Sequence, residues 1–441
     1  MNKLKAFFAG AVSFLLIASI LFASISQSFF ASAKSIDTVY TAETSKSQAS
    51  KSNSETSKSQ TETKTSKSST ETKTSKSTAS STDAVDSNLA KNGRAAALMD
   101  FDTGTVVFEK NADEKYPIAS MVKIMTLLLA FEDIADGKMT ANTPINISEN
   151  AASMGGSQAF LDANTQYKAG DLIKSIVVAS ANDSCVAMAE HMAGTVESFV
   201  ARMNAKAASL GMKNTNFVNC TGLPAPNGYS TARDVSLMMR ALLAHNEFYG
   251  YAGVWTFDFA HNSGRTTTLT NTNKLINAYK GCDGGKTGFT QEAHYCLAAT
   301  AKRDNTRLIS VVMGAKDSKL RNLDVSTLFN HGFGNYETRQ FVFKDKPLEN
   351  IIVKKSRQEL LPIAPKDDYF YFTAKGKKPN VSHEVSVDQN FAPVAKGQKV
   401  GTLIVKQDDK LVQEIDLIAT MNMDKVEFVD VLQKLAKVWF L

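Results

Sequence analysis

The first stretch of the chain with a clear fold pattern alternates between apolar and polar positions. Residues 95–110, A-A-A-L-M-D-F-D-T-G-T-V-V-F-E-K, are typical of two strands around an Asp-x-Gly turn. Residues 117–132 then repeat apolar side chains at Ile124, Leu127 and Phe131, which is the period of a helix. The pattern therefore predicts a strand hairpin followed by a helix.

The same reading predicts a helical middle and a return to strands. Residues 171–193, 196–209 and 231–245 carry the helical period, and strand patterns resume from about residue 266. The last two strand patterns of this region, residues 295–303 and 307–314, flank Asp304–Asn305, a dipeptide typical of a hairpin turn. Strands at both ends and helices between them predict an α/β (α+β) domain, whose sheet is assembled from both ends around a helical lobe.

The pattern of apolar and polar residues changes after Gly334. Residues 336–420 are short alternating runs separated by polar turns such as K-G-K-K-P-N, which predicts a small all-β domain. Residues 421–441 form an amphipathic segment with Phe428, Leu432 and Trp439 on one helical face. Packing of this helix on the β domain is one possibility. We favour the other, that it lies at a membrane surface.

The N-terminal part has the features of an export signal and a spacer. Residues 1–33 join two lysines, a long apolar core and A-S-A, so we expect a signal peptide cleaved after Ala33; the alternative is an uncleaved anchor. Either places the rest of the chain outside the cytoplasm. Residues 34–90 are Ser/Thr/Lys-rich and repetitive, which predicts a disordered spacer before a folded domain at 91–335.

Composition narrows the function classes. A chain of 441 residues with 43% hydrophobic content predicts two or more globular domains. The formal net charge of +6 forms no basic stripe, so nucleic acid is not an expected partner. The four cysteines have no C-x-x-C spacing and the six histidines no metal-binding spacing, so neither a metal nor a cofactor is expected. Cys282 and Cys296 could pair across a hairpin, or all four thiols could be buried and free.

Ser120 and Lys123 are the first candidates for chemistry. On a helix, positions i and i+3 share a face, so the lysine amine can reach the serine hydroxyl. A serine needs a base to become a nucleophile, and a lysine buried among apolar side chains can have a pKa low enough to be that base. An S-x-x-K sequence alone occurs by chance in most chains of this size.

Two later segments give the pair its context. Residues 179–184, A-S-A-N-D-S, interrupt an apolar helical pattern with Ser180 and Asn182, which is costly unless these side chains face a cleft. Residues 284–290, G-G-K-T-G-F-T, begin a strand whose glycines permit close approach of a ligand backbone. Lys286 and Thr287 on that strand suit a terminal carboxylate.

The three segments together carry a family resemblance. S-x-x-K, S-x-N about 60 residues later and K-T-G about a hundred further form the ordered motifs of the penicillin-recognising serine enzymes. Within that group, residues 92–335 resemble the low-molecular-weight D-alanyl-D-alanine carboxypeptidases of peptidase family S11. The resemblance implies a serine β-lactamase/transpeptidase-like fold, an antiparallel sheet flanked by helices, and extends to the β domain and the C-terminal anchor.

The resemblance also implies roles for individual residues. Ser120 would be the acylated nucleophile, Lys123 its general base, and Ser180 the proton donor to the leaving D-alanine nitrogen. Asn182 would hold the substrate amide and orient Lys123. The substrate carboxylate would lie near a group of binding residues, and the backbone N–H groups of Ser120 and Phe289 would form the oxyanion hole. The residues that bind the substrate would be Lys286, Thr287, Gly288 and Arg321. Gly288 would let the peptide lie against the strand as an added strand.

One position departs from the family pattern. Family members often have histidine where this chain has Phe289, so a proton-transfer role for that side chain is not expected here. The backbone donor is unaffected.

The activity that the resemblance implies is removal of the C-terminal D-alanine from peptidoglycan stem pentapeptides. It also implies covalent inhibition by penicillins, a role in cell-wall biogenesis and cell shape, and a location at the outer face of the bacterial cytoplasmic membrane or in the wall. A serine β-lactamase is an alternative, although no E-x-x-L-N motif lies between Ser180 and Lys286. Endopeptidase or transpeptidase activity and a catalytically silent wall-binding module remain open.

Overall fold

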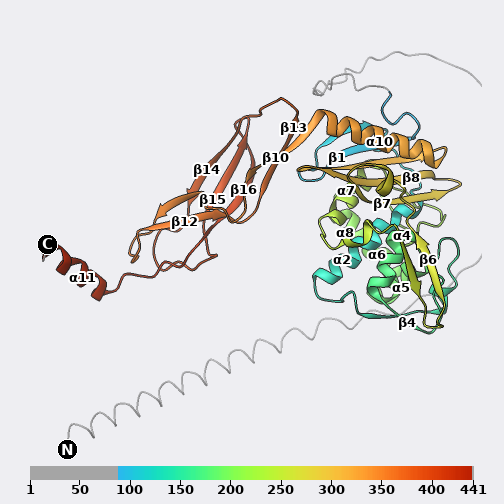
Figure 1. The fold of residues 1–441 in the computed structure, drawn as a ribbon, viewed down its shortest axis with the longest axis horizontal. Coiled ribbons are helices and arrows are strands. Elements are labelled where there is room, and N and C mark those ends of the chain that lie inside the picture. The colour runs from blue at the N-terminus through green and yellow to red at the C-terminus, as the bar shows by residue number, and fades with distance from the viewer. Residues whose placement is uncertain (1–87, 440–441) are drawn as a thin grey trace, which may run out of the picture. The chain divides into compact units, whose positions relative to one another are not determined.

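A central antiparallel sheet organises the first domain of this computed structural model, which describes residues 88–439 (Figure 1). Its strand order is β2-β1-β9-β8-β7, so strands from the two ends of the domain meet at the β1–β9 pair. The hairpin around the Asp-x-Gly turn and the hairpin at Asp304–Asn305 are confirmed. The five strands are β1 (Ala95–Asp100), β2 (Val106–Lys110), β7 (Cys282–Thr290), β8 (His294–Arg303) and β9 (Thr306–Ala315).

Helices cover both faces of this sheet. All six residues of β1 are buried, and Ala95, Ala97 and Met99 contribute to a different hydrophobic cluster from Ala96 and Leu98. One cluster joins the sheet to the helical lobe, and the other joins it to α10 (Ser318–Asn335), a helix that the sequence pattern does not predict. Burial on both faces explains why A-A-A-L-M shows no apolar–polar alternation.

The helical lobe lies between β2 and β7 in the chain. It contains the predicted helices and several short elements. The helices are η1 (Ala119–Val122), α2 (Lys123–Ala135), α3 (Glu149–Ala152), α4 (Ala169–Ala179), α5 (Asn182–Ala193), α6 (Val196–Ser209), α7 (Ala232–Leu243), α8 (Phe248–Ala252) and α9 (Leu275–Ala278). The short strands are β3 (Pro144–Asn146), β4 (Gln166–Lys168), β5 (Thr256–Ala260) and β6 (Thr266–Thr270).

The expectation of a continuous helix over residues 171–193 is wrong. The helix breaks at Ser180, whose φ of 64° is left-handed and ends α4, and α5 starts at Asn182. A left-handed residue cannot continue a right-handed helix. The interruption that the polar side chains of Ser180 and Asn182 mark in the sequence is therefore a break in the backbone.

The second domain is all-β, as predicted. Its five-stranded sheet has the order β11-β12-β16-β15-β14, and β10 pairs separately with β13. At the start of β10, Thr338 Oγ1 donates to the buried Asp100 carboxylate at 2.8 Å, which ties this strand to β1. The strands are β10 (Tyr336–Val342), β11 (Glu349–Ile352), β12 (Leu360–Pro365), β13 (Tyr369–Ala374), β14 (Val381–Val387), β15 (Lys399–Gln407) and β16 (Lys410–Ala419).

The C-terminal helix is shorter than the predicted segment 421–441. It is α11 (Phe428–Trp439), because Met423 is buried and its backbone pairs with Val394 of the β domain. The apolar face of α11 is exposed, with Phe428 at 76% and Trp439 at 86%. Among residues 88–439, no helix is long and apolar enough to cross a membrane.

Two predictions concern the start of the chain. The signal peptide at 1–33 and most of the spacer at 34–90 lie outside the described residues. At the spacer's end, Leu89 and Ala90 are buried in the cluster around α10, so the folded part already includes them.

The four cysteines are all buried and free. The strand register places Cys282 opposite Ala301, and Cys296 opposite Gly288. These two cysteines are therefore not cross-strand partners, and the alternative of four buried thiols describes this structure.

Candidate active site

Ser120 and Lys123 meet where a 3₁₀ turn passes into a helix. Ser120 lies in η1 and is half-buried, while Lys123 opens α2 and is fully buried. The distance from Lys123 Nζ to Ser120 Oγ is 3.1 Å. A neutral amine at this position can accept the serine proton directly.

The surroundings of Lys123 favour its neutral form. Its side chain lies in the lobe's hydrophobic cluster with Met121 and Ile124, and burial lowers the pKa of the amine to about 8. Two oxygen atoms hold it in place, since Nζ donates to Asn182 Oδ1 at 2.6 Å and to the Thr221 carbonyl at 2.5 Å. The amine is thus fixed beside the serine and loses its proton within reach of physiological pH.

The second motif lies at the break between α4 and α5. Asn182 is anchored on two sides, because its Nδ2 donates to the Gly155 carbonyl at 2.7 Å and its backbone N–H donates to the Ser157 carbonyl at 2.7 Å. Ser180, which has a left-handed backbone conformation, has a different partner: its hydroxyl accepts a hydrogen bond from Lys286 of β7. The S-x-N spacing therefore serves two different lysines.

The third motif is on β7, at the edge of the sheet. Lys286 Nζ donates to Ser180 Oγ at 2.8 Å and to the Thr287 carbonyl at 3.0 Å. Burial, and then the nearby Lys123 and Arg321 cations, hold the pKa of Lys286 well below its ordinary value. The structure thus forms two hydrogen-bonded groups, Lys123 with Ser120 and Asn182, and Lys286 with Ser180, close enough for the two lysine charges to interact.

Arg321 lies on the other side of the sheet edge. It is buried on α10, and its guanidinium donates to the Cys296 carbonyl at 3.4 Å and to Asn322 Oδ1 at 2.9 Å. Burial lowers the pKa of Arg321 to about 10. It has no direct hydrogen bond to Lys286 or Thr287, so it belongs to the site through its charge alone.

Gly288 and Phe289 continue the strand beyond Thr287. A Cβ on Gly288 would come within 2.6 Å of the Ile118 carbonyl, so the absent side chain allows β7 to lie against the turn that carries Ser120. The Phe289 ring is 46% exposed and packs against Tyr295 of β8 in a tilted arrangement, with ring centroids 4.3 Å apart. Its ring contact is with Tyr295 and not with Lys123 or Lys286, so this side chain has no part in proton transfer between them.

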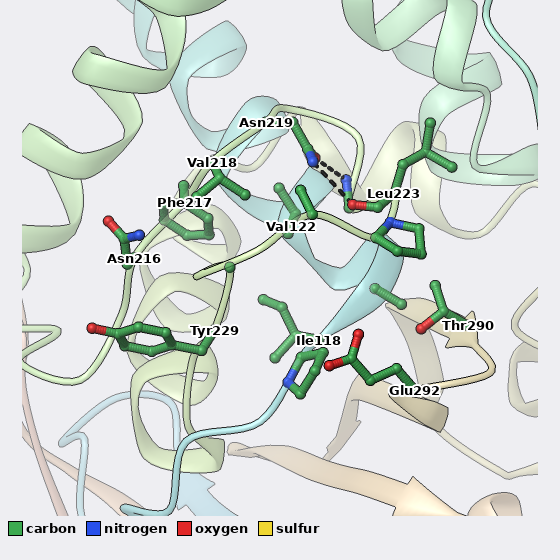
Figure 2. A pocket seen from close by; sticks show the side chains of 16 residues that line it. Ile118, Val122, Asn216, Phe217, Val218, Asn219, Leu223, Tyr229, Thr290 and Glu292 are labelled. Carbon is green, nitrogen blue, oxygen red and sulfur yellow. Dashed lines mark hydrogen bonds between the residues drawn. The ribbon is translucent and has the colours of Figure 1, made fainter. Parts of the chain in front are cut away.

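The site also depends on residues that none of the three motifs includes. The Thr221 carbonyl that fixes Lys123 lies in a turn held by Asn219, whose Oδ1 accepts from Gly222 N at 2.7 Å (Figure 2). Asp183 is fully buried and accepts the backbone N–H groups of Ala159 and Leu161. In the sequence, the signals for these residues are the Asn-x-x-Gly pattern at 219–222, which is typical of a turn, and the aspartate directly after S-x-N.

The Thr287 hydroxyl also has a partner that the motif does not reveal. It donates to Thr272 Oγ1 at 2.8 Å. Thr272 precedes α9, and its N–H bonds the Val178 carbonyl of α4. Thr287 is therefore positioned by the helical lobe as well as by its own strand.

The arrangement is suited to acyl transfer by a serine nucleophile. It provides a half-buried hydroxyl, an amine of lowered pKa next to it, and a second hydroxyl–amine pair. Within residues 88–439, no group of histidine, cysteine, aspartate and glutamate side chains has the arrangement of a metal site.

Comparison with known proteins places this site in a family. Residues 76–317 match the family described as "D-alanyl-D-alanine carboxypeptidase", and residues 336–425 match "Penicillin-binding protein 5, C-terminal domain". The chain is 39% identical over 355 residues to D-alanyl-D-alanine carboxypeptidase DacF of Bacillus subtilis, covering 80% of this chain and 91% of that protein. It is 33% identical over 358 residues to DacC of Escherichia coli, covering 76% and 86%.

A solved structure agrees with these relatives. Penicillin-binding protein 5 of Haemophilus influenzae is 32% identical, with a TM-score of 0.60, over 76% of this chain and 98% of that one. The similarity includes both the serine-containing domain and the all-β domain. On these matches and the shared fold, the chain belongs to the D-alanyl-D-alanine carboxypeptidase family.

Proposed function

We propose that this protein is a serine-type D-alanyl-D-alanine carboxypeptidase that removes the terminal D-alanine from peptidoglycan stem pentapeptides. The observation that carries the proposal is the 3.1 Å contact between Ser120 Oγ and the buried Lys123 amine, whose pKa is lowered to about 8. A fixed, partly deprotonated amine beside a hydroxyl supplies the base that a serine needs to form an acyl-enzyme.

The positions of the side chains support a reaction through an acyl-enzyme. Ser120 Oγ attacks the carbonyl of the penultimate D-alanine while its proton passes to Lys123 Nζ. Ser180 donates a proton to the departing D-alanine nitrogen and is resupplied by Lys286, to which it is hydrogen-bonded at 2.8 Å. An ester to Ser120 remains, and water hydrolyses it to release the tetrapeptide and restore the hydroxyl.

The remaining residues bind the substrate in this proposal. Lys286 and Thr287 hold the terminal carboxylate, whose negative charge favours the protonated form of the Lys286 amine. Arg321 adds positive charge, and Asn182 receives the substrate amide while it orients Lys123. The backbone N–H groups of Ser120 and Phe289 stabilise the oxyanion, and each such donor is typically worth about 3 kcal/mol.

The same serine would be acylated by β-lactams. A β-lactam offers a strained amide carbonyl and a carboxylate at the positions of the peptide's scissile bond and terminus, so it uses the same nucleophile and the same cations. Slow hydrolysis of the resulting ester makes the compound an inhibitor.

The test is release of D-alanine from a synthetic pentapeptide by the wild-type chain and by Ser120→Ala. We expect free D-alanine from the wild type and none above background from the variant, because Ser120 carries the one hydroxyl that contacts the Lys123 amine among residues 88–439. Labelling by a fluorescent penicillin should disappear in the same variant. Its thermal unfolding midpoint serves as the folding control, and labelling that persists would remove Ser120 from the nucleophile role.

We also propose that the protein is exported and associates with the outer face of the cytoplasmic membrane. The support is a lysine-flanked apolar segment at 1–33 and the exposed apolar face of α11. An amphipathic helix of this kind lies in the headgroup region with its apolar side chains in the acyl boundary.

A further inference from the structure

The loop at residues 154–161 lies against the start of α5 and holds Asn182. The Gly155 carbonyl accepts from Asn182 Nδ2, and the Ser157 carbonyl accepts from the Asn182 backbone N–H, both at 2.7 Å. Asn182 Oδ1 in turn accepts from the Lys123 amine at 2.6 Å. The position of the amine beside the nucleophile therefore depends on this loop.

The loop is itself held by Asp183, the next residue of α5. The Asp183 carboxylate accepts the backbone N–H of Ala159 at 3.0 Å and that of Leu161 at 3.1 Å. Phe160, between them, has a left-handed φ of 64° and a ring that is 52% exposed. The loop thus directs two N–H groups inward onto one carboxylate and its aromatic ring outward.

The charge of Asp183 is unusual for its surroundings. The side chain is fully buried, and its hydrogen-bond partners within residues 88–439 are backbone N–H groups rather than cations. His261 is a titratable group that this charge influences, but burial holds the pKa of His261 below its ordinary value. Burying a carboxylate without a cation is costly, and the N–H donors and the N-terminal end of α5 offset part of that cost. An uncharged amide could accept an N–H without this cost, so the charge itself indicates a further role.

The charge acts on the proposed base, Lys123. Burial lowers the pKa of the Lys123 amine to about 8, and three neighbours oppose burial, in the order Cys185, Cys220 and Asp183. Thiols ordinarily keep their proton at neutral pH, so the carboxylate supplies the negative charge there. The Lys286 amine is a further titratable group that interacts with Lys123.

From this geometry we propose that Asp183 is a positioning residue, which fixes the loop 154–161 around Asn182 and places a negative charge near the base Lys123. The charge helps the buried amine to hold the proton that it takes from Ser120, because a negative charge stabilises an ammonium ion. The inference rests on the proposed function, since it takes Lys123 as the general base of acylation.

The test is the pH profile of acylation by a fluorescent penicillin, measured for the wild type and for Asp183→Asn. Loss of a negative charge near an ammonium ion lowers its pKa, so the midpoint of the profile should lie about one pH unit lower in the variant. The plateau rate at high pH should fall about tenfold, because the amide has one acceptor oxygen for two loop N–H groups and Asn182 is held less firmly. Rates are taken per labelled chain, so that unfolded chains do not contribute.

Asp324→Asn is the matched control. Asp324 is also a buried carboxylate, and it accepts the backbone N–H groups of Asn92 and Gly93 at 2.8 Å, but it lies on α10. This variant should lose stability and keep the wild-type midpoint and plateau. A wild-type profile in Asp183→Asn, or the same shift in both variants, overturns the positioning role and leaves the carboxypeptidase proposal intact. A wild type that is not labelled at all overturns the proposed function, and the positioning role with it.

Hydrogen exchange of the wild-type chain tests the loop contact without any substitution. The amides of Ala159 and Leu161 should exchange at least about tenfold more slowly than that of the exposed Gly156 in the same loop, because they donate to a buried carboxylate. Equally fast exchange of all three amides would overturn the contact, and with it the positioning role, even if Asp183→Asn does not fold.

Discussion

Lys123 shows how one buried side chain sets the working range of the protein. Its amine is surrounded by apolar side chains and accepts no carboxylate partner among the described residues, so burial dominates and the pKa falls to about 8. The three oxygens around it, from Ser120, Asn182 and Thr221, fix the position of the amine. A surface lysine would remain protonated at neutral pH and could not take a proton from serine.

This predicts a pH dependence for acylation. Below the pKa the amine is protonated and cannot act as a base, so the second-order rate of acylation by a fluorescent penicillin should fall about tenfold per pH unit. The rate should rise with pH and level off above about pH 8. A rate that is flat from about pH 6 to about pH 9 would contradict the base role of Lys123.

Substitution tests the same residue independently of pH. Lys123→Ala should fold and acylate about 10²- to 10⁴-fold more slowly, which is the usual contribution of a general base. The measurement is the rate of penicillin labelling, with thermal unfolding as the check on folding. Labelling at the wild-type rate would show that another group removes the proton.

At the scale of elements, the site depends on how closely β7 approaches η1. The glycine of K-T-G-F-T lies against the backbone of residues 118–121, and a side chain there would collide with the Ile118 carbonyl. Since the oxyanion donors proposed for the site come one from each of these elements, their separation sets the geometry of catalysis.

Gly288→Ala tests this contact. A Cβ 2.6 Å from a carbonyl oxygen must push the two elements apart, so we expect a loss of about 1–3 kcal/mol in the free energy of unfolding. Penicillin acylation should slow at the same time. Gly250→Ala is the control, because a Cβ on this exposed helical glycine meets nothing within 4 Å. Unchanged stability and acylation in Gly288→Ala would show that the contact is not needed.

At the scale of the whole molecule, the chain combines a catalytic domain with an all-β domain and a terminal amphipathic helix. The exposed apolar side chains of α11 include Phe428, Leu432, Leu435 and Trp439. Arg357 of the β domain forms ion pairs with Glu427 and Asp430 next to and within this helix. The polar side of α11 thus contacts the β domain, while its apolar side is exposed and suited to bind a membrane surface.

Removal of residues 424–441 should therefore abolish binding of the protein to lipid vesicles. Replacement of both Leu432 and Leu435 by Gln in the full chain should weaken binding about tenfold or more, given the transfer energy of a leucine side chain. Gln433→Ala lies away from that face and should bind as the wild type. Sedimentation with vesicles measures all three. Full binding by the truncated chain would place the membrane contact elsewhere.

The sequence predicted the parts of the site that depend on local order. Ser120 and Lys123 are three residues apart at a helix start, and this spacing alone brings the amine to the hydroxyl. Helix 196–209, the two hairpins and the all-β domain also followed from periodicity, because alternation and the 3.6-residue repeat reflect which face of an element is buried.

The rest depended on contacts between segments far apart in the chain. The break at Ser180 needed a left-handed residue in a stretch that reads as one helix, and its partner Lys286 is more than a hundred residues away. The Thr221 carbonyl is a backbone atom with no sequence signature, and α10 has no clear periodic pattern because it packs mixed side chains. Sequence alone thus determined which groups are present and their local spacing, whereas tertiary packing decided their burial, and burial is what gives Lys123 a pKa low enough to act as a base.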